Sequence, residues 1–131
     1  MPYTTYHASC HCGDVRFEAD VDLSAGTTKC NCTYCFKNRY WSLSVFPDRF
    51  REIASPNVAK SGSLTPGRCA RCGVLTFARV TATDWNPVDH VAISVAAFDD
   101  IDPTDLASAP VTHCDGLHDN WWAAPAEVRH L

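Results

Sequence analysis

The sequence has no long apolar run and no excess of positive charge, and each absence excludes a class of protein. None of its apolar stretches approaches the roughly 18–20 residues that span a bilayer. The segment Met1–Ala8 is polar and lacks the apolar core of a secretory signal peptide. The formal net charge of −4 argues against a nucleic-acid-binding surface, which is normally basic. We therefore expect a cytoplasmic protein that binds neither nucleic acid nor membrane.

Helix signals are also scarce in the 131 residues. Short helical turns are expected only at 32–39 and at 102–107, where a proline follows Asp102. Alternation of apolar and polar residues, with β-branched residues, predicts strands over 15–19, 41–46, 74–80 and 91–96. The stretches 61–67 and 82–89 are expected to be loops. Because no repeat or linker divides the chain, we predict a single mostly β domain over residues 1–131, built from small antiparallel sheets.

Cysteine is present in unusual number and arrangement. Seven of the eight cysteines form three tight clusters: Cys10 with Cys12, Cys30 with Cys32 and Cys35, and Cys69 with Cys72. In a reducing compartment, clustered cysteines are more often metal ligands than disulfides. The alternative of a disulfide framework suits the spacing poorly, because two cysteines separated by one residue do not easily bridge each other.

The clusters divide naturally between two zinc ions. The pairs Cys10/Cys12 and Cys69/Cys72 together supply four thiolates, which predicts a closed structural site. Cys30, Cys32 and Cys35 give a second zinc only three ligands. Either a fourth ligand completes that site, from Cys114, His11, His113 or an acidic residue, or the fourth position stays open to a substrate.

An open three-thiolate zinc favours sulfur chemistry. Three thiolates donate much charge to the metal, so a bound water is acidified less than in a three-histidine site, whereas an incoming thiol is bound well. Three cations flank the cluster and are candidates for binding the carboxylates of an anionic thiol such as glutathione: Lys29, Lys37 and Arg39. The alternative is that these cations are ordinary solvated surface charge.

Several aromatic residues and one cysteine remain open to two interpretations. Tyr34, Phe36, Tyr40 and Trp41 surround the trio of cysteines and either line a pocket or belong to the core. The adjacent tryptophans at 121 and 122 either cover the core or contribute to a homodimer contact. Cys114 lies outside the clusters and is expected to be a buried, inert thiol.

The cysteine motifs, with their glycines, resemble those of the glutathione-dependent formaldehyde-activating enzyme family, also called the centromere protein V family. The likeness extends over essentially the whole chain. Its strongest parts are Cys10-His-Cys12-Gly13-Asp-Val-Arg-Phe17, Cys30-Asn-Cys32-Thr-Tyr-Cys35 and Cys69-Ala-Arg-Cys72-Gly73. Softer parts are Val45-Phe46-Pro47, Ile93-Ser-Val-Ala-Ala-Phe98-Asp99-Asp100 and Cys114-Asp115-Gly116-Leu-His-Asp119.

The resemblance implies a β-tent fold with few helical turns and two zinc sites. It implies a structural zinc on the two outer pairs and a catalytic zinc on Cys30, Cys32 and Cys35. The implied activity is that of a carbon–sulfur lyase, which joins formaldehyde to glutathione as S-hydroxymethylglutathione. The partners implied are therefore a small thiol and a small aldehyde.

One stretch departs from the family pattern. Members often carry a histidine and an aromatic residue just before the second outer pair, where this chain reads Leu64-Thr-Pro-Gly-Arg68. If those positions line the pocket, this chain accepts a different thiol or carbonyl compound. Two other functions stay open: a non-catalytic zinc module that binds a protein partner, and a sensor whose trio loses zinc on oxidation.

Overall fold

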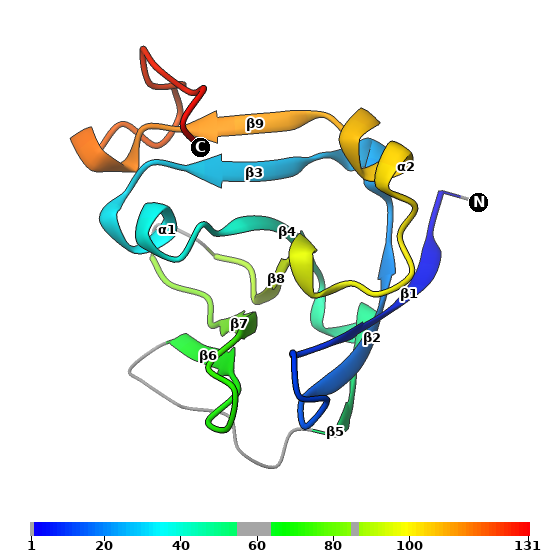
Figure 1. Ribbon diagram of the computed structural model, residues 1–131. Helices are drawn as coiled ribbons and strands as arrows, with labels where there is room; N and C mark the ends of the chain where they lie inside the picture. The colour runs from blue at the N-terminus through cyan, green and yellow to red at the C-terminus, as the bar shows by residue number, and fades with distance from the viewer. Residues whose placement is uncertain (1, 55–63, 85–86) are drawn as a thin grey trace.

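The protein is mostly β, and its strands form two sheets (Figure 1). A computed structural model describes residues 2–54, 64–84 and 87–131. The strands are β1 (Thr4–Ser9), β2 (Arg16–Val21), β3 (Thr27–Cys30), β4 (Trp41–Val45), β5 (Phe50–Ala54), β6 (Leu64–Arg68), β7 (Leu75–Val80), β8 (His90–Ser94) and β9 (Val111–Cys114). The helices are α1 (Thr33–Lys37) and α2 (Pro103–Ser108), with 3₁₀ turns η1 (Leu23–Ala25), η2 (Pro47–Arg49), η3 (Val95–Ala97) and η4 (Gly116–His118).

The smaller sheet has the order β1-β2-β5 and the larger one β6-β7-β8-β4-β3-β9. Every pair in them is antiparallel except β3 with β9, which run parallel and place Cys30 opposite Cys114. The expectation of purely antiparallel sheets is therefore wrong at this edge. Parallel neighbours need a long crossover, which the intervening chain from β4 to α2 provides here, and local sequence patterns do not reveal such a pairing.

The core lies where the two sheets face each other. Phe17 from β2, Phe50 from β5 and Phe77 from β7 form a cluster with ring centroids 4.9–5.4 Å apart. Val91 and Ile93 of β8 are completely buried beside this cluster. Burying each such side chain stabilises the fold by about 1.5–3 kcal/mol, so this core holds the sheets together before any metal contributes.

The predicted elements are largely confirmed, with two corrections. The strands expected over 15–19, 41–46 and 74–80 correspond to β2, β4 and β7, and both short helices are present. The strand expected over 91–96 ends earlier, at Ser94, where the chain enters η3. The loop expected over 61–67 is wrong from residue 64 onward, because β6 pairs with β7 through a register shift near Pro66. Residues 61–63 lie outside the described part.

The helices begin at capping side chains. The Asp102 carboxylate accepts a hydrogen bond from the Thr104 N–H at 2.8 Å, which explains why the chain turns into α2 directly before Pro103. Within residues 2–54, 64–84 and 87–131, no helix combines the length and the apolar character needed to cross a membrane.

Candidate metal centres

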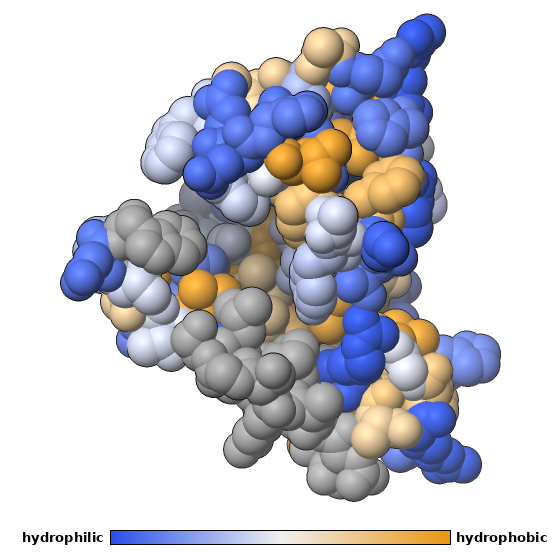
Figure 2. Space-filling view, turned by 90° about the vertical axis from the view of Figure 1, so that its left-hand side faces the viewer, coloured by the Kyte–Doolittle hydropathy of each residue, from blue (hydrophilic) through white to orange (hydrophobic). Residues whose placement is uncertain are grey.

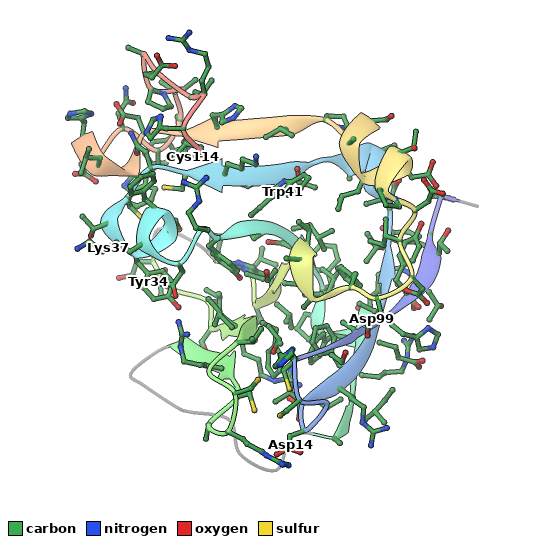
Figure 3. All side chains as sticks on the ribbon, in the orientation of Figure 1. Asp14, Tyr34, Lys37, Trp41, Asp99 and Cys114 are labelled. Atoms are coloured by element: carbon green, nitrogen blue, oxygen red, sulfur yellow. The ribbon has the colours of Figure 1, made fainter. Side chains whose placement is uncertain are left out.

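Four of the clustered cysteines lie in the turns of two β-hairpins that belong to different sheets. Cys10 and Cys12 connect β1 to β2, and Cys69 and Cys72 connect β6 to β7. Their four Sγ atoms all lie within 4.8 Å of one another, and Figure 3 shows the sulfurs of both turns close together above Asp14. We call this group the knuckle site. A metal ion bound here joins the smaller sheet to the larger one.

The two turns share several backbone features. In each, the N–H of the first cysteine donates to a valine carbonyl at 3.0 Å, which closes the turn. Gly13 and Gly73 take φ values of +84° and +80°, a region that side chains with a Cβ rarely adopt. Amide groups then point at the sulfurs: Val15 N lies 3.3 Å from Cys10 Sγ, and Arg71 N and Cys72 N each lie 3.4 Å from Cys69 Sγ.

The sulfur geometry of the knuckle site fits tetrahedral zinc. Cys12 Sγ lies 3.7 Å from Cys10 Sγ and 3.6 Å from Cys69 Sγ. With a Zn–S bond of about 2.3 Å, a regular tetrahedron places its sulfurs about 3.8 Å apart. These distances are far longer than the S–S bond of a disulfide, which is about 2.05 Å. Cys10 and Cys69 are buried whereas Cys12 is exposed, and four cysteine ligands would leave a bound ion no coordination position for a substrate.

Crowding makes the ionisation of these thiols interdependent. A hydrogen bond from the Val74 amide is the main cause that lowers the pKa of Cys72 to about 6. The Asp14 amide acts in the same direction on Cys12, but burial and the neighbouring thiols outweigh it and raise the pKa of Cys12 to about 12. Four thiolates at this separation need a cation between them, and the charge of a divalent ion such as Zn²⁺ would meet that need.

The remaining clustered cysteines lie where β3 joins α1, and we call them the trio site. Cys30 ends β3, Cys32 caps the N-terminus of α1, and Cys35 lies within that helix. Their Sγ atoms also lie within 4.8 Å of one another. Cys32 N donates to Cys30 Sγ and Cys35 N donates to Cys32 Sγ, both at 3.4 Å. Burial is the main cause that raises the pKa of Cys35, so metal binding must displace its proton.

The trio site has three protein ligands in the described part of the chain. No further cysteine, histidine or acidic residue there brings a ligand atom within 4.8 Å of all three sulfurs. This applies to each of the candidates for a fourth ligand, His11, His113 and Cys114. Cys114 lies beside Cys30 across the parallel pair and is half-buried, and burial raises the pKa of its thiol. The donor set therefore fits a zinc with one position left for a ligand from solution.

A cavity of about 200 Å³ adjoins the trio site and is lined by Cys30 and Cys35. Two of the three predicted cations, Lys29 and Arg39, line it as well, whereas Lys37 does not. Lys37 follows Cys35 by two positions, which places it on the opposite face of α1, and Figure 3 shows it directed outward. Figure 2, which views the side that carries α1, shows hydrophobic atoms within a hollow between hydrophilic surfaces.

The aromatic residues near the trio divide between cavity and surface. Phe36, Tyr40 and Trp41 line the cavity, whereas Tyr34 is exposed. The Tyr40 hydroxyl is buried and has no hydrogen-bond partner in the described structure, and burial raises its pKa well above the usual range. A buried hydroxyl without a partner costs about 1–3 kcal/mol, so Tyr40 is a candidate for hydrogen bonding to a ligand.

Two residues that shape the trio site, Asn31 and Gly116, were not predicted from the sequence. The buried Asn31 side chain donates to Asp115 Oδ1 at 2.8 Å and accepts from the Leu117 N–H at 3.0 Å, which holds η4 against the trio. A Cβ on Gly116 would lie 2.8 Å from Cys30 Sγ and 2.5 Å from the Trp121 ring. The available signals were an asparagine between two ligands and a glycine following Asp115, and neither reveals a partner so distant in sequence.

The two sites predict metal release in two phases. With a mild chelator, we expect the trio metal to leave at least about tenfold faster than the knuckle metal, because a three-ligand site with an open position exchanges more readily. Elemental analysis of samples taken during chelation, with the Cys32→Ser variant as control, measures this. The control should show only the slow phase, and release of both metals in one phase from the wild type contradicts the assignment.

Comparison with known proteins supports the fold alone. No family model matches the chain. The chain is similar to a crystal structure of a Rhodobacter sphaeroides protein determined as a structural genomics target. The TM-score is 0.62 at 22% sequence identity, and the match covers 81% of this chain and 99% of that one.

Proposed function

We propose that the trio site binds a zinc ion and a small anionic thiol, with glutathione as the leading candidate. The observation that carries the proposal is that Cys30 and Cys35 share one cavity with two cations, Lys29 and Arg39. A thiol is the preferred fourth ligand of a three-thiolate zinc, and its carboxylates match the cations. The chain is thus proposed to belong to the glutathione-dependent formaldehyde-activating enzymes.

The reaction proposed is the addition of a thiol to formaldehyde or another small aldehyde, or its reversal as a carbon–sulfur lyase. The thiol loses its proton to solvent, sulfur forms a bond to the carbonyl carbon, and the π electrons of the C=O bond move to oxygen, which is then protonated. When bound, zinc supplies a Lewis acid that favours the ionised form of the thiol. Nothing is oxidised or reduced, and the product is a hydroxyalkyl thioether.

The cavity residues have separate roles in this proposal. Lys29 and Arg39 orient the thiol through its carboxylates, and the Phe36 and Trp41 rings exclude water from the reacting atoms. The Tyr40 hydroxyl, which lacks a partner in the described structure, donates a hydrogen bond to the aldehyde oxygen as negative charge develops there. The side chains at 64–67, where the chain departs from the family pattern, lie outside the described side chains.

A second candidate function is a zinc module that binds a protein partner. The observation that favours it is apolar exposure around η4: Trp122 is 90% exposed, Leu117 56% and Trp121 45%. The alternative that these tryptophans cover the core is therefore wrong for Trp122, and a homodimer contact stays a prediction. Exposed aromatic residues of this kind are enriched at interfaces. Such a module requires neither thiol binding nor turnover.

Calorimetry distinguishes the two candidates. We expect glutathione to bind the zinc-loaded wild type with release of about one proton near neutral pH, because the thiol ionises on binding. Titration in two buffers of different ionisation enthalpy measures the proton. The Cys30→Ser/Cys32→Ser variant should lose at least about tenfold in affinity, while Cys114→Ser, beside the trio, should keep it.

If the Cys30→Ser/Cys32→Ser variant binds glutathione with unchanged affinity, the assignment of the thiol-binding site to the trio is wrong. NMR with ¹³C-labelled formaldehyde then follows formation of the thioether above the spontaneous rate. Thiol binding without acceleration removes the enzymatic part of the proposal and retains the binding site.

A further inference from the structure

The segment Val128–Leu131 lies against the trio site although it is about a hundred residues away in sequence. Figure 1 shows the chain turning back after η4 so that its end lies beside β9 and β3, close to α1. The Leu131 N–H donates to the Val128 carbonyl at 3.0 Å, which curls the segment into a compact turn. Leu131 lines the same cavity as Cys30 and Cys35.

Both cavity cations already hydrogen-bond to main-chain oxygens of this segment. Arg39 Nη1 donates to the His130 carbonyl at 2.7 Å, and Lys29 Nζ donates to the Leu131 oxygen at 3.3 Å. The His130 ring also packs on the Phe36 ring, with centroids 5.4 Å apart. The segment thus uses the donors that the proposed function assigns to a ligand.

Contacts with aromatic rings hold Lys29 and Arg39 in position beside the segment. Lys29 Nζ lies 4.6 Å from the centroid of the Trp41 ring, and the Arg39 guanidinium carbon lies 5.5 Å from the centroid of the Phe36 ring. Arg39 also has a φ of +51°, which is uncommon for a residue with a side chain and costs of order 1 kcal/mol. Arg39 directly follows the C-cap of α1, where a left-handed residue commonly ends a helix, so the end of α1 places Arg39 beside the cavity.

We propose that Lys29 and Arg39 form a binding site for acceptor oxygens beside the trio, and that Val128–Leu131 occupies it when no ligand is bound. A thiol with carboxylates then displaces the segment, since a hydrogen bond from Arg39 to a carboxylate is stronger than the one that it makes to the neutral His130 carbonyl. The apparent affinity for every ligand is then the intrinsic affinity multiplied by the fraction of molecules in which the segment is displaced. The ligand part of this inference rests on the proposed function, whereas the part about the segment does not.

The test weakens the packing of the segment without touching the cations or the cysteines. In His130→Ala/Leu131→Ala, the ring contact with Phe36 and the side chain that lines the cavity are lost. Arg129→Ala is the matched control, because Arg129 is bonded to Glu127 and is not among the residues that line the cavity. The probe is iodoacetamide, and mass spectrometry measures the alkylation rate of Cys35, with the exposed Cys12 of the knuckle site as internal standard.

We expect Cys35 alkylation to be about fivefold faster in the double variant than in the wild type, with Cys12 unchanged and the Arg129→Ala variant equal to the wild type. Glutathione affinity should rise by a similar factor. An unchanged or slower rate at Cys35, or an equal gain in Arg129→Ala, overturns the role of the segment. Faster alkylation with unchanged glutathione affinity overturns the competition but not the proposed thiol site. If glutathione binds neither protein, the proposed function fails and the alkylation rates still decide the role of the segment.

Discussion

Cys69→Ser is expected to lower the melting temperature by about 10 °C or more, because it opens the closed metal site that joins the two sheets. Cys69 Sγ lies 3.6 Å from Cys12 Sγ and accepts two amide N–H groups, so its loss affects both hairpins. Structural zinc contributes on the order of 10 kcal/mol to folding in small domains, and a three-ligand remainder retains only part of it. Thermal melts of zinc-loaded protein, followed by circular dichroism, measure the change.

Cys32→Ser is the matched control, since it also exchanges one sulfur for oxygen at a cluster. Serine is a favourable N-cap, so α1 should keep its first turn although the trio metal is lost. We expect a melting temperature within a few degrees of the wild type. If Cys32→Ser destabilises as much as Cys69→Ser, the trio is structural and the division of roles between the sites is wrong.

The fold class followed from the sequence, but five of the nine described strands did not: β1, β3, β5, β6 and β9. Strand β4 alternates buried and exposed positions, which is a clear strand pattern. In β1 only Ala8 is buried, and β9 has no fully buried residue, so neither shows the alternation on which recognition depends. Strand β3 is only four residues long and owes its place to partners at both sides, β4 and β9. Its parallel partner is more than eighty residues away.

The grouping of the cysteines into two candidate metal sites was predictable because thiol spacing is a local property. Cys30, Cys32 and Cys35 lie within six residues, so one ion reaches all three whatever the fold. The surroundings of that ion were not predictable, because they depend on which distant segments fold back. Leu131 lines the cavity and Asn31 binds the loop at 115–117, and both follow from the position of β9 beside β3.

Gly116→Ala is expected to weaken metal binding at the trio by about tenfold or more while the knuckle metal is retained. A Cβ at this position would lie 2.5 Å from the Trp121 ring and 2.8 Å from Cys30 Sγ, both shorter than any normal contact. Gly116 is not among the described glycines with a positive φ, so alanine adds no backbone strain and the effect is steric. Either the Trp121 ring or the Cys30 ligand must move.

The Trp121 ring has limited freedom to give way. Its Nε1 donates to Asp119 Oδ1 at 2.7 Å, and the Asp115 N–H donates to the Ala123 carbonyl at 3.0 Å, which holds the segment that carries the ring. Overpacking of this kind costs about 1–3 kcal/mol, which corresponds to a change of about fivefold to more than a hundredfold in an equilibrium constant. We therefore expect the displaced group to include the Cys30 sulfur.

Cobalt(II) substitution measures the effect, because the thiolate-to-metal charge-transfer absorption of each site reports its occupancy. Titration with cobalt(II) should show two tightly bound equivalents of metal in the wild type and in Leu117→Ala. In Gly116→Ala, the second equivalent should bind more weakly. Leu117→Ala is the matched control because it changes the neighbouring residue of η4, whose side chain is 56% exposed. If Gly116→Ala binds two equivalents of cobalt equally tightly, the Trp121 ring moves alone. The contact between η4 and Cys30 then does not hold the Cys30 sulfur in place.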